Sequence, residues 1–269
     1  MVPRKASHLR PTLNPFALII VRPPRGARAS RPQKVSGASH NKELKISFRR
    51  DAPQAMLEVK TFICNPLQEN TYIVSDETKD CVIIDCGAFF EYEKEAIIKH
   101  ITDNHLVVKH LLCTHGHFDH VMGNRALCEH LQIKPEYSQL DEPLMGHTPQ
   151  NIAMFLGVNT YEEMPLAENY IDGSSLIVFG NHTFKVLETP GHTHGSLTFY
   201  CEEEKIAFTG DTLFKMSIGR TDFEESSAEE MQHSLLHLLA TLPDDTVCYT
   251  GHGPSTTMGY ERHTNPFLQ

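Results

Sequence analysis

The chain has 269 residues, of which 40% are hydrophobic, and this length and composition are those of a globular protein with a buried core. Its formal net charge is −10 at pH 7, but the charge is unevenly distributed. Residues 1–55 contain 12 Lys/Arg and only two acidic residues, Glu43 and Asp51. Residues 56–269 therefore contain 12 basic and 32 acidic residues, a net charge of −20. A segment this acidic repels a phosphate backbone, so we expect no nucleic-acid partner. The longest apolar run, residues 16–21, is far shorter than the roughly 20 residues of a membrane span, so we expect no membrane partner.

Residues 1–55 differ in composition from the rest of the chain. They are rich in Arg, Pro and Ser and poor in acidic residues, which predicts a disordered extension. Such a segment resembles a mitochondrial presequence. Because Met56 directly precedes the first clean strand pattern, we favour the alternative that the start site has been assigned too far upstream. We therefore predict one folded domain, residues 56–269. The seven scattered cysteines, without a Cys-x-x-Cys pair, fit a reducing compartment, so we expect a cytoplasmic protein, mitochondrial only if residues 1–55 are a genuine presequence.

The first half of the predicted domain alternates between strands and helices. Apolar and β-branched runs predict strands at residues 57–64, 70–75, 81–87 and 107–115, and apolar positions at helical spacing predict helices at residues 91–104, 124–132 and 141–156.

The second half is richer in strands. Tight polar turns separate predicted strands at residues 175–180, 182–191, 196–203 and 205–214, and a last strand is predicted at residues 246–253. Between them, residues 226–242 carry an apolar stripe behind a capping box of Ser226 and Glu229, which predicts a helix. Two strand-rich halves with helices predict an α+β fold, in which two sheets pack together and helices lie outside.

Three histidines and an aspartate are crowded into six positions of the sequence CTHGHFDHVMGN, where the strand predicted to end at residue 115 runs into a loop. Along an extended backbone His115 and His117 can face one point, while Asp119 and His120 turn toward another nearby. Imidazole nitrogen with carboxylate oxygen is a ligand set that suits Zn²⁺, with Fe or Mn as substitutes. This segment therefore predicts two adjacent sets of metal ligands.

Further candidate ligands follow three later strands. His192 lies in TPGHTHGS, Asp211 in FTGDTLF and His252 in YTGHGPST, each after an apolar strand and an adjacent glycine that lets the backbone bend sharply. Together with the first cluster, seven donors at four strand ends are enough for two complete sites.

The motifs THGHFDH, PGHT, GDTLF, SIGRTDF and GHGPST, in this order from Met56 onward, resemble the metallo-β-lactamase superfamily and, within it, the glyoxalase II-like hydrolases. The resemblance implies a four-layer αββα sandwich with a dinuclear metal site along the top edge of the two sheets. It implies that one metal takes His115, His117 and His192, that the other takes Asp119, His120 and His252, and that Asp211 bridges them.

By this resemblance the expected activity is hydrolysis of a thioester or ester in a small molecule. Two zinc ions about 3.5–4 Å apart would share one water and lower its pKa towards 7, which yields a bridging hydroxide without a side-chain base. The ions would also polarise the carbonyl under attack. We expect Asp119 and Asp211 to be the catalytic carboxylates, with Asp119 orienting the hydroxide.

Several residues near the motifs have simpler interpretations. We expect His194 to be a surface histidine, Cys113 a small buried strand residue, and the pair His233 and His237 surface or packed histidines of a helix. For Arg220 and Asp222, support of the metal ligands and an ordinary buried ion pair stay open as alternatives.

The substrate is less well defined than the chemistry. Glyoxalase II enzymes carry an additional C-terminal helical domain that contacts glutathione, whereas this chain stops 17 residues after His252 (269 − 252), which puts glutathione specificity in doubt. Residues 140–157 and 256–269 are the expected pocket walls, and neither has the cluster of basic residues expected for a tripeptide with two carboxylates. The acyl partner therefore stays open.

Other activities share the fold. A persulfide dioxygenase-like oxidoreductase would use one iron held by His115, His192 and Asp211, and a complete second set of donors argues against it. A lactonase or β-lactamase would need the same metals and a different pocket. A processing nuclease would need a basic surface. The protein could also bind zinc only for stability. Structural zinc sites are usually closed and rich in cysteine, whereas the seven donors here are histidines and aspartates, which favours catalysis.

Overall fold

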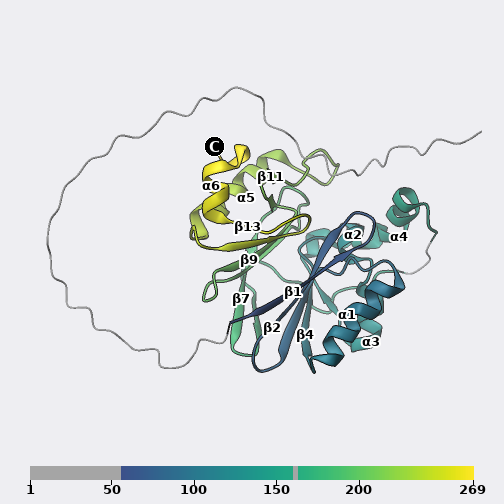
Figure 1. Cartoon of the computed structure of the whole chain (residues 1–269). Helices are drawn as coiled ribbons and strands as arrows, with labels where there is room; N and C mark the ends of the chain where they lie inside the picture. The colour runs from purple at the N-terminus through teal and green to yellow at the C-terminus, as the bar shows by residue number, and fades with distance from the viewer. Residues whose placement is uncertain (1–55, 160–162) are drawn as a thin grey trace, which may run out of the picture.

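The structure is a computed structural model that describes residues 56–159 and 163–269 (Figure 1). The extension predicted for residues 1–55 lies outside the described residues. Within the described part, no helix is both long and apolar enough to cross a lipid bilayer.

The first sheet contains strands β1 to β5 in chain order. Its strands are β1 (Glu58–Cys64), β2 (Glu69–Ser75), β3 (Asp80–Ile84), β4 (Val107–Leu112) and β5 (Pro135–Glu136). The first three form an antiparallel meander, as predicted, and β3, β4 and β5 are parallel.

The second sheet has the order β13-β12-β9-β8-β7-β6. Its strands are β6 (Leu176–Phe179), β7 (His182–Glu188), β8 (Leu197–Cys201), β9 (Ile206–Gly210), β12 (Val247–Thr250) and β13 (Thr256–Thr257). Strands β6 to β9 are antiparallel neighbours, and β12 runs parallel to β9. A separate two-stranded ribbon consists of β10 (Leu213–Phe214) and β11 (Ser217–Ile218).

Helices cover the outer faces of both sheets (Figure 1). The helices are α1 (Glu91–Asp103), α2 (Phe118–Val121), α3 (Asn124–Leu131), α4 (Glu142–Leu156), α5 (Ala228–Thr241) and α6 (Met258–Thr264), with short 3-10 turns η1 (Gln139–Asp141) and η2 (Pro266–Leu268). Of these, α1 and α3 cover the first sheet and α5 and α6 the second, while α2 packs against α4. Three apolar clusters separate the layers: one between the sheets, one beneath α1 and α3, and one beneath α5 and α6.

Strand β2 shows how the layers arise from the sequence. All of its residues are buried, but Tyr72 and Val74 belong to the cluster between the sheets, whereas Ile73 belongs to the cluster under α1 and α3. A strand with period-two alternation that is apolar on both faces must lie between two layers. The predicted α+β fold, a four-layer αββα sandwich, is confirmed.

Two segments differ from the prediction. The strand predicted at residues 205–214 divides at Gly210, whose φ of +48° is strained for other residues and whose added Cβ would come within 2.4 Å of Thr114 Oγ1. The C-terminal residues 256–269, expected as a pocket wall, instead form β13, α6 and η2, and Met258 packs with the cluster beneath α5.

The N-terminus of α5 is capped one residue later than predicted. Ser227, not Ser226, is the capping residue, and its hydroxyl accepts a hydrogen bond from the Glu230 amide. Ser226 instead donates its hydroxyl proton to the His192 carbonyl at 2.7 Å. We expect Ser227→Ala to lower the free energy of unfolding by about 1 kcal/mol, the usual value of a serine cap, in urea denaturation. The matched variant Ser255→Ala, at an exposed position, should change it by less than about 0.5 kcal/mol; equal losses would contradict this assignment of the cap.

Candidate metal centre

All seven predicted donors lie at one edge of the sandwich. His115 and His117 follow β4, Asp119 and His120 lie in α2, and the other three follow later strands: His192 after β7, Asp211 after β9 and His252 after β12. Strands β3 and β4 are parallel, and β7, β9 and β12 point the same way within their sheet, so the carboxyl ends of all these strands meet at this edge.

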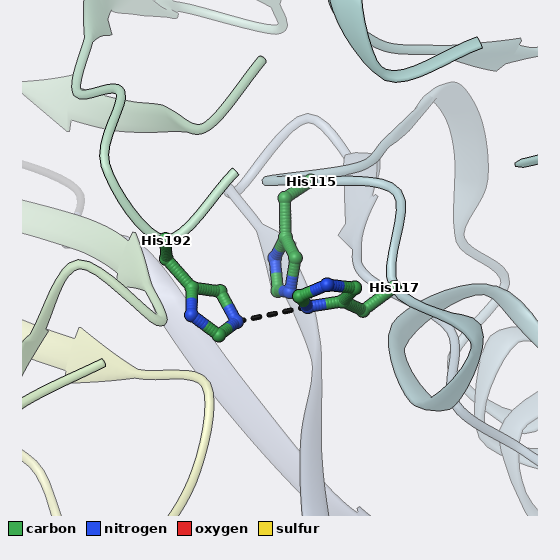
Figure 2. Close-up of side chains that lie close together, drawn as sticks. All are labelled: His115, His117 and His192. Atoms are coloured by element: carbon green, nitrogen blue, oxygen red, sulfur yellow. Dashed lines mark hydrogen bonds between the residues drawn. The ribbon is translucent and has the colours of Figure 1, made fainter. Parts of the chain in front are cut away.

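Three histidines form the first donor group. One ring nitrogen each from His115, His117 and His192 lies within 4.8 Å of the others. Figure 2 shows the three imidazoles gathered together, and the dashed line joins His117 Nδ1 to His192 Nε2 at 2.9 Å.

Asp119, His120 and His252 form the second donor group by the same criterion. His120 Nε2 lies 3.2 Å from His252 Nε2, and His252 Nε2 lies 3.3 Å from Asp119 Oδ2. When neither nitrogen carries a proton, such a short contact brings two lone pairs toward one point, which is the arrangement that a cation would stabilise.

Asp211 lies between the two groups. Its Oδ2 is 3.4 Å from His192 Nε2 and 3.8 Å from His252 Nε2, and its Oδ1 is 3.4 Å from His120 Nε2. A Cβ on Gly251 would come within 2.2 Å of Asp211 Oδ1, so the backbone leaves room for this carboxylate only because residue 251 is glycine.

The residues fit a metal because buried donor atoms lack protein partners. His115 Nε2 is fully buried without a hydrogen-bond partner, and Asp211 Oδ1 likewise has no well-formed hydrogen bond, although His120 Nε2 lies 3.4 Å from it. Leaving such groups unpaired costs about 1–3 kcal/mol each. A cation bound among them would satisfy both atoms.

The other ring nitrogen of each histidine is held by the surrounding protein. The contacts are His115 Nδ1 to Thr114 Oγ1 at 3.0 Å, His117 Nε2 to Glu225 at 2.9 Å, His120 Nδ1 to Asp85 at 2.9 Å, His192 Nδ1 to the Arg220 carbonyl at 2.9 Å, and His252 Nδ1 to the Leu67 carbonyl at 3.1 Å. Such contacts fix the tautomer and ring orientation, so that the remaining nitrogen is free to bind a metal.

Burial and mutual charge set the protonation of these donors. Burial lowers the pKa of His115 well below its usual value and that of His192 to about 4, so both are neutral near pH 7. Burial works against the ionisation of Asp119, but His120 and His252 lower its pKa to about 2. Burial also opposes protonation of His120, yet Asp211 and Asp119 raise its pKa well above the usual value, so a metal bound there would displace a proton.

Asp85 supports both donor groups and was not among the predicted site residues. It accepts hydrogen bonds from the Thr114 amide at 2.7 Å, from Thr114 Oγ1 at 2.8 Å and from His120 Nδ1. Because Thr114 Oγ1 in turn accepts from His115, one carboxylate orients a histidine of each group. The sequence signal was its place at the end of an apolar strand, two residues before Gly87.

Asp141 is a second support that the sequence did not reveal. Its carboxylate accepts from the amides of Gly116 and Gly195, both at 2.8 Å, and from Thr193 Oγ1 at 2.7 Å. It therefore ties the loop of His115 and His117 to the loop of His192.

The remaining predictions near the motifs have clear outcomes. His194 is a surface residue paired with Glu230, Cys113 is fully buried, and His233 and His237 are exposed, all as expected. Of the two alternatives for Arg220 and Asp222, support of a candidate ligand holds for Arg220, whose backbone carbonyl contacts His192 Nδ1 at 2.9 Å. The buried ion pair is wrong, because the Asp222 carboxylate that pairs with Arg220 is 68% exposed.

A cavity of about 620 Å³ opens onto the centre, and His117, Asp119, His192, Asp211 and His252 line its floor. Of the two segments expected as walls, residues 140–157 contribute Asn151, Met154 and Phe155, whereas residues 256–269 contribute nothing to the lining. The latter prediction is wrong because α6 packs against the outer face of the second sheet.

Glu225 offers a test of the support around the histidines. Its hydrogen bond with His117 lowers the pKa of Glu225, so the carboxylate is charged and holds the ring with Nδ1 toward the centre. We expect Glu225→Ala to weaken zinc affinity about 10- to 100-fold in a competition titration with a chromogenic chelator. Glu224→Ala removes the neighbouring, exposed charge and should change the affinity less than about twofold. Equal weakening in both variants would mean that general charge, not the contact with His117, matters.

The comparisons with known proteins agree on one family. The metallo-beta-lactamase superfamily matches residues 64–252. Hydroxyacylglutathione hydrolase GloC of Haemophilus influenzae is 37% identical over 202 residues, 75% of this chain and 93% of that protein. Among solved structures, TTHA1623 in a di-iron-bound form has a TM-score of 0.69 and 35% identity, covering 78% of this chain and 100% of that one. BLEG-1 B3 metallo-beta-lactamase has a TM-score of 0.71 and 31% identity, covering 79% and 100%. The chain therefore belongs to the metallo-β-lactamase superfamily.

Proposed function

We propose that the protein is a hydrolase that cleaves thioesters with two divalent metal ions held at the sheet edge. His115, His117 and His192 would bind one ion, Asp119, His120 and His252 the other, and Asp211 both. The observation that carries the proposal is that the buried Nε2 of His115 has no protein partner, while the opposite nitrogen of every one of the five histidines is already held.

Zinc is the metal we propose, with iron or manganese as substitutes, because neutral imidazoles and carboxylates suit all three. Two such ions would activate a water molecule at neutral pH and polarise the carbonyl of the substrate. Asp119, anionic on the cavity floor, would accept a hydrogen bond from the attacking water and orient it toward that carbonyl.

The thioester bond is proposed because of the relative from Haemophilus influenzae. That protein is named a hydroxyacylglutathione hydrolase, and the match covers 93% of its length, which supports a thioester as the substrate of this chain. The cations that line the cavity are Lys215 and Arg220.

A substrate panel tests the proposal. The zinc-loaded protein should hydrolyse S-lactoylglutathione or simple thioesters, and a chelator should abolish the turnover until zinc is added back. A lactone and a chromogenic β-lactam serve as alternative substrates. Turnover of either one without thioester hydrolysis, or thioester turnover that resists the chelator, would overturn it.

A mononuclear iron oxidoreductase that uses His115, His192 and Asp211 is the alternative from a different reaction class. The second donor group, Asp119, His120 and His252, argues against it, because an enzyme with one metal has no use for it. Metal analysis separates the two: about two ions per chain support the hydrolase, and a single iron supports the oxidoreductase.

A further inference from the structure

The cavity above the candidate metal centre has two unlike walls. Apart from Asp119 on the floor, the wall formed by the β1–β2 loop, α2 and α4 consists of the uncharged residues Leu67, Phe118, Asn151, Met154 and Phe155. The opposite wall, formed by the β10–β11 ribbon and the loop after it, carries the charged residues Lys215, Arg220, Glu224 and Glu225. A substrate that spans the cavity therefore meets an uncharged surface on one side of the metal centre.

Aromatic rings make up much of the uncharged wall. The rings of Phe118 and Phe155 are stacked, with centroids 5.4 Å apart and an interplanar angle of 13°. Beside them Met154 is 70% exposed, although it is a large apolar residue on a helix. Large apolar side chains gathered at the mouth of a cavity are typical of a surface that binds an apolar ligand, and methionine adapts readily to the ligand's shape.

The charged wall also presents apolar surface toward the centre. Phe214, Ile218 and Phe223 line it. The Arg220 guanidinium lies 4.2 Å from the centroid of the Phe223 ring and is paired with Asp222, so its charge is already partnered. Apolar side chains thus lie on both sides of the metal centre.

The cavity is large compared with a small hydroxyacyl group. Its volume of about 620 Å³ is within the range of sites that enclose drug-sized ligands, roughly 300–1,000 Å³. A lactoyl group would leave most of the apolar wall in contact with water. A ring or branched chain would cover it, and the hydrophobic effect would favour that complex.

We propose, resting on the proposed thioesterase function, that the preferred substrates are thioesters with an aromatic or branched apolar group close to the thioester carbon, and that Met154 and Phe155 select this group. The apolar group could belong to the acyl part or to the thiol part, since either can lie against the α2–α4 wall.

Two pairs of substrates separate these sources. Phenylacetyl and acetyl thioesters of N-acetylcysteamine test the acyl part, and the acetyl thioesters of benzyl mercaptan and N-acetylcysteamine test the thiol part. Each kcat/KM is divided by the rate of alkaline hydrolysis, which removes differences in intrinsic reactivity. We expect at least a roughly tenfold preference for the aromatic member of one pair, because even one methylene in an apolar pocket can change kcat/KM about 10-fold or more.

The variants test which residues select the group. Met154→Gln puts a polar side chain of similar length at an exposed position, where folding tolerates it, and Phe155→Ala removes one of the stacked rings. Both should reduce the preference at least about threefold. Leu176→Gln, at an exposed apolar position on β6 away from the cavity, should leave the preference and the activity unchanged. Product binding gives a readout without turnover: phenylacetate or benzyl mercaptan should bind at least about tenfold more tightly than acetate or N-acetylcysteamine.

The outcomes distinguish this proposal from the function on which it rests. Equal normalised kcat/KM within both pairs, or a preference that neither Met154→Gln nor Phe155→Ala reduces, would overturn the substrate class and leave thioester hydrolysis standing. No turnover of any thioester by zinc-loaded protein would overturn both.

Discussion

Replacing Asp211 with alanine is expected to remove bound metal and abolish measurable turnover. Its carboxylate lies within 4 Å of nitrogens from both donor groups, those of His192, His120 and His252. Without this carboxylate, neither proposed ion has its full set of ligands. The positive charges of the two ions are also no longer offset by an anion between them. Metal assistance contributes several kcal/mol, so a loss of about 4 kcal/mol corresponds to a fall of about 10³-fold or more in kcat/KM. Metal content by elemental analysis and kcat/KM on a thioester are the two measurements.

The control for Asp211→Ala is His194→Ala. His194 lies two residues after His192 but pairs with Glu230 at 2.9 Å, and its side chain is 49% exposed. Metal content should stay at the wild-type value, and kcat/KM should change less than about twofold. If both variants lost metal equally, the proposed set of ligands would be wrong.

Asp85→Ala is expected to cause the largest loss of stability. It would leave the buried N–H groups of Thr114 and His120 without their acceptor, and removal of one partner from a buried charged contact costs about 3–5 kcal/mol. The φ of Asp85 is +53°, a left-handed conformation that alanine adopts at a further cost of about 1 kcal/mol, whereas asparagine tolerates it. Urea denaturation of the metal-free protein should therefore show a large loss for Asp85→Ala and a smaller one for Asp85→Asn.

Zinc affinity separates support of the metal from folding stability. Both variants at position 85 should bind zinc about 10- to 100-fold more weakly, because His115 and His120 lose their common anchor. Asp172→Asn, in an exposed turn, should change stability by less than about 1 kcal/mol and leave zinc affinity unchanged. Wild-type stability and affinity in Asp85→Ala would refute this role.

The fold and the convergence of the seven candidate donors could be predicted because their signals are local. His115, Asp211 and His252 each follow an apolar strand within three residues, and such a pattern can be read from one short segment. Strand ends that share one edge then bring distant segments together without further information, as Asp211 and His252 after the parallel strands β9 and β12 illustrate.

The supporting residues could not be predicted because their contacts join remote segments. Glu225 lies 108 residues from His117, and Asp141 lies 25 and 54 residues from the two glycine amides that it holds. No periodicity or motif marks an acidic residue for such contacts. The seven-residue helix α6 could not be predicted for a related reason, because its stability does not come from an apolar pattern of its own. Met258 packs in a cluster with distant residues, and Glu261 accepts hydrogen bonds from Met216 and Thr256.

Zinc titration of the metal-free protein tests the central claim most directly. Thioester turnover is followed as zinc is added in fractions of an equivalent per chain. If both donor groups bind an ion and Asp211 joins them, activity should rise until two equivalents are present and then remain constant. A plateau at one equivalent, or no activity at any zinc concentration, would contradict the account.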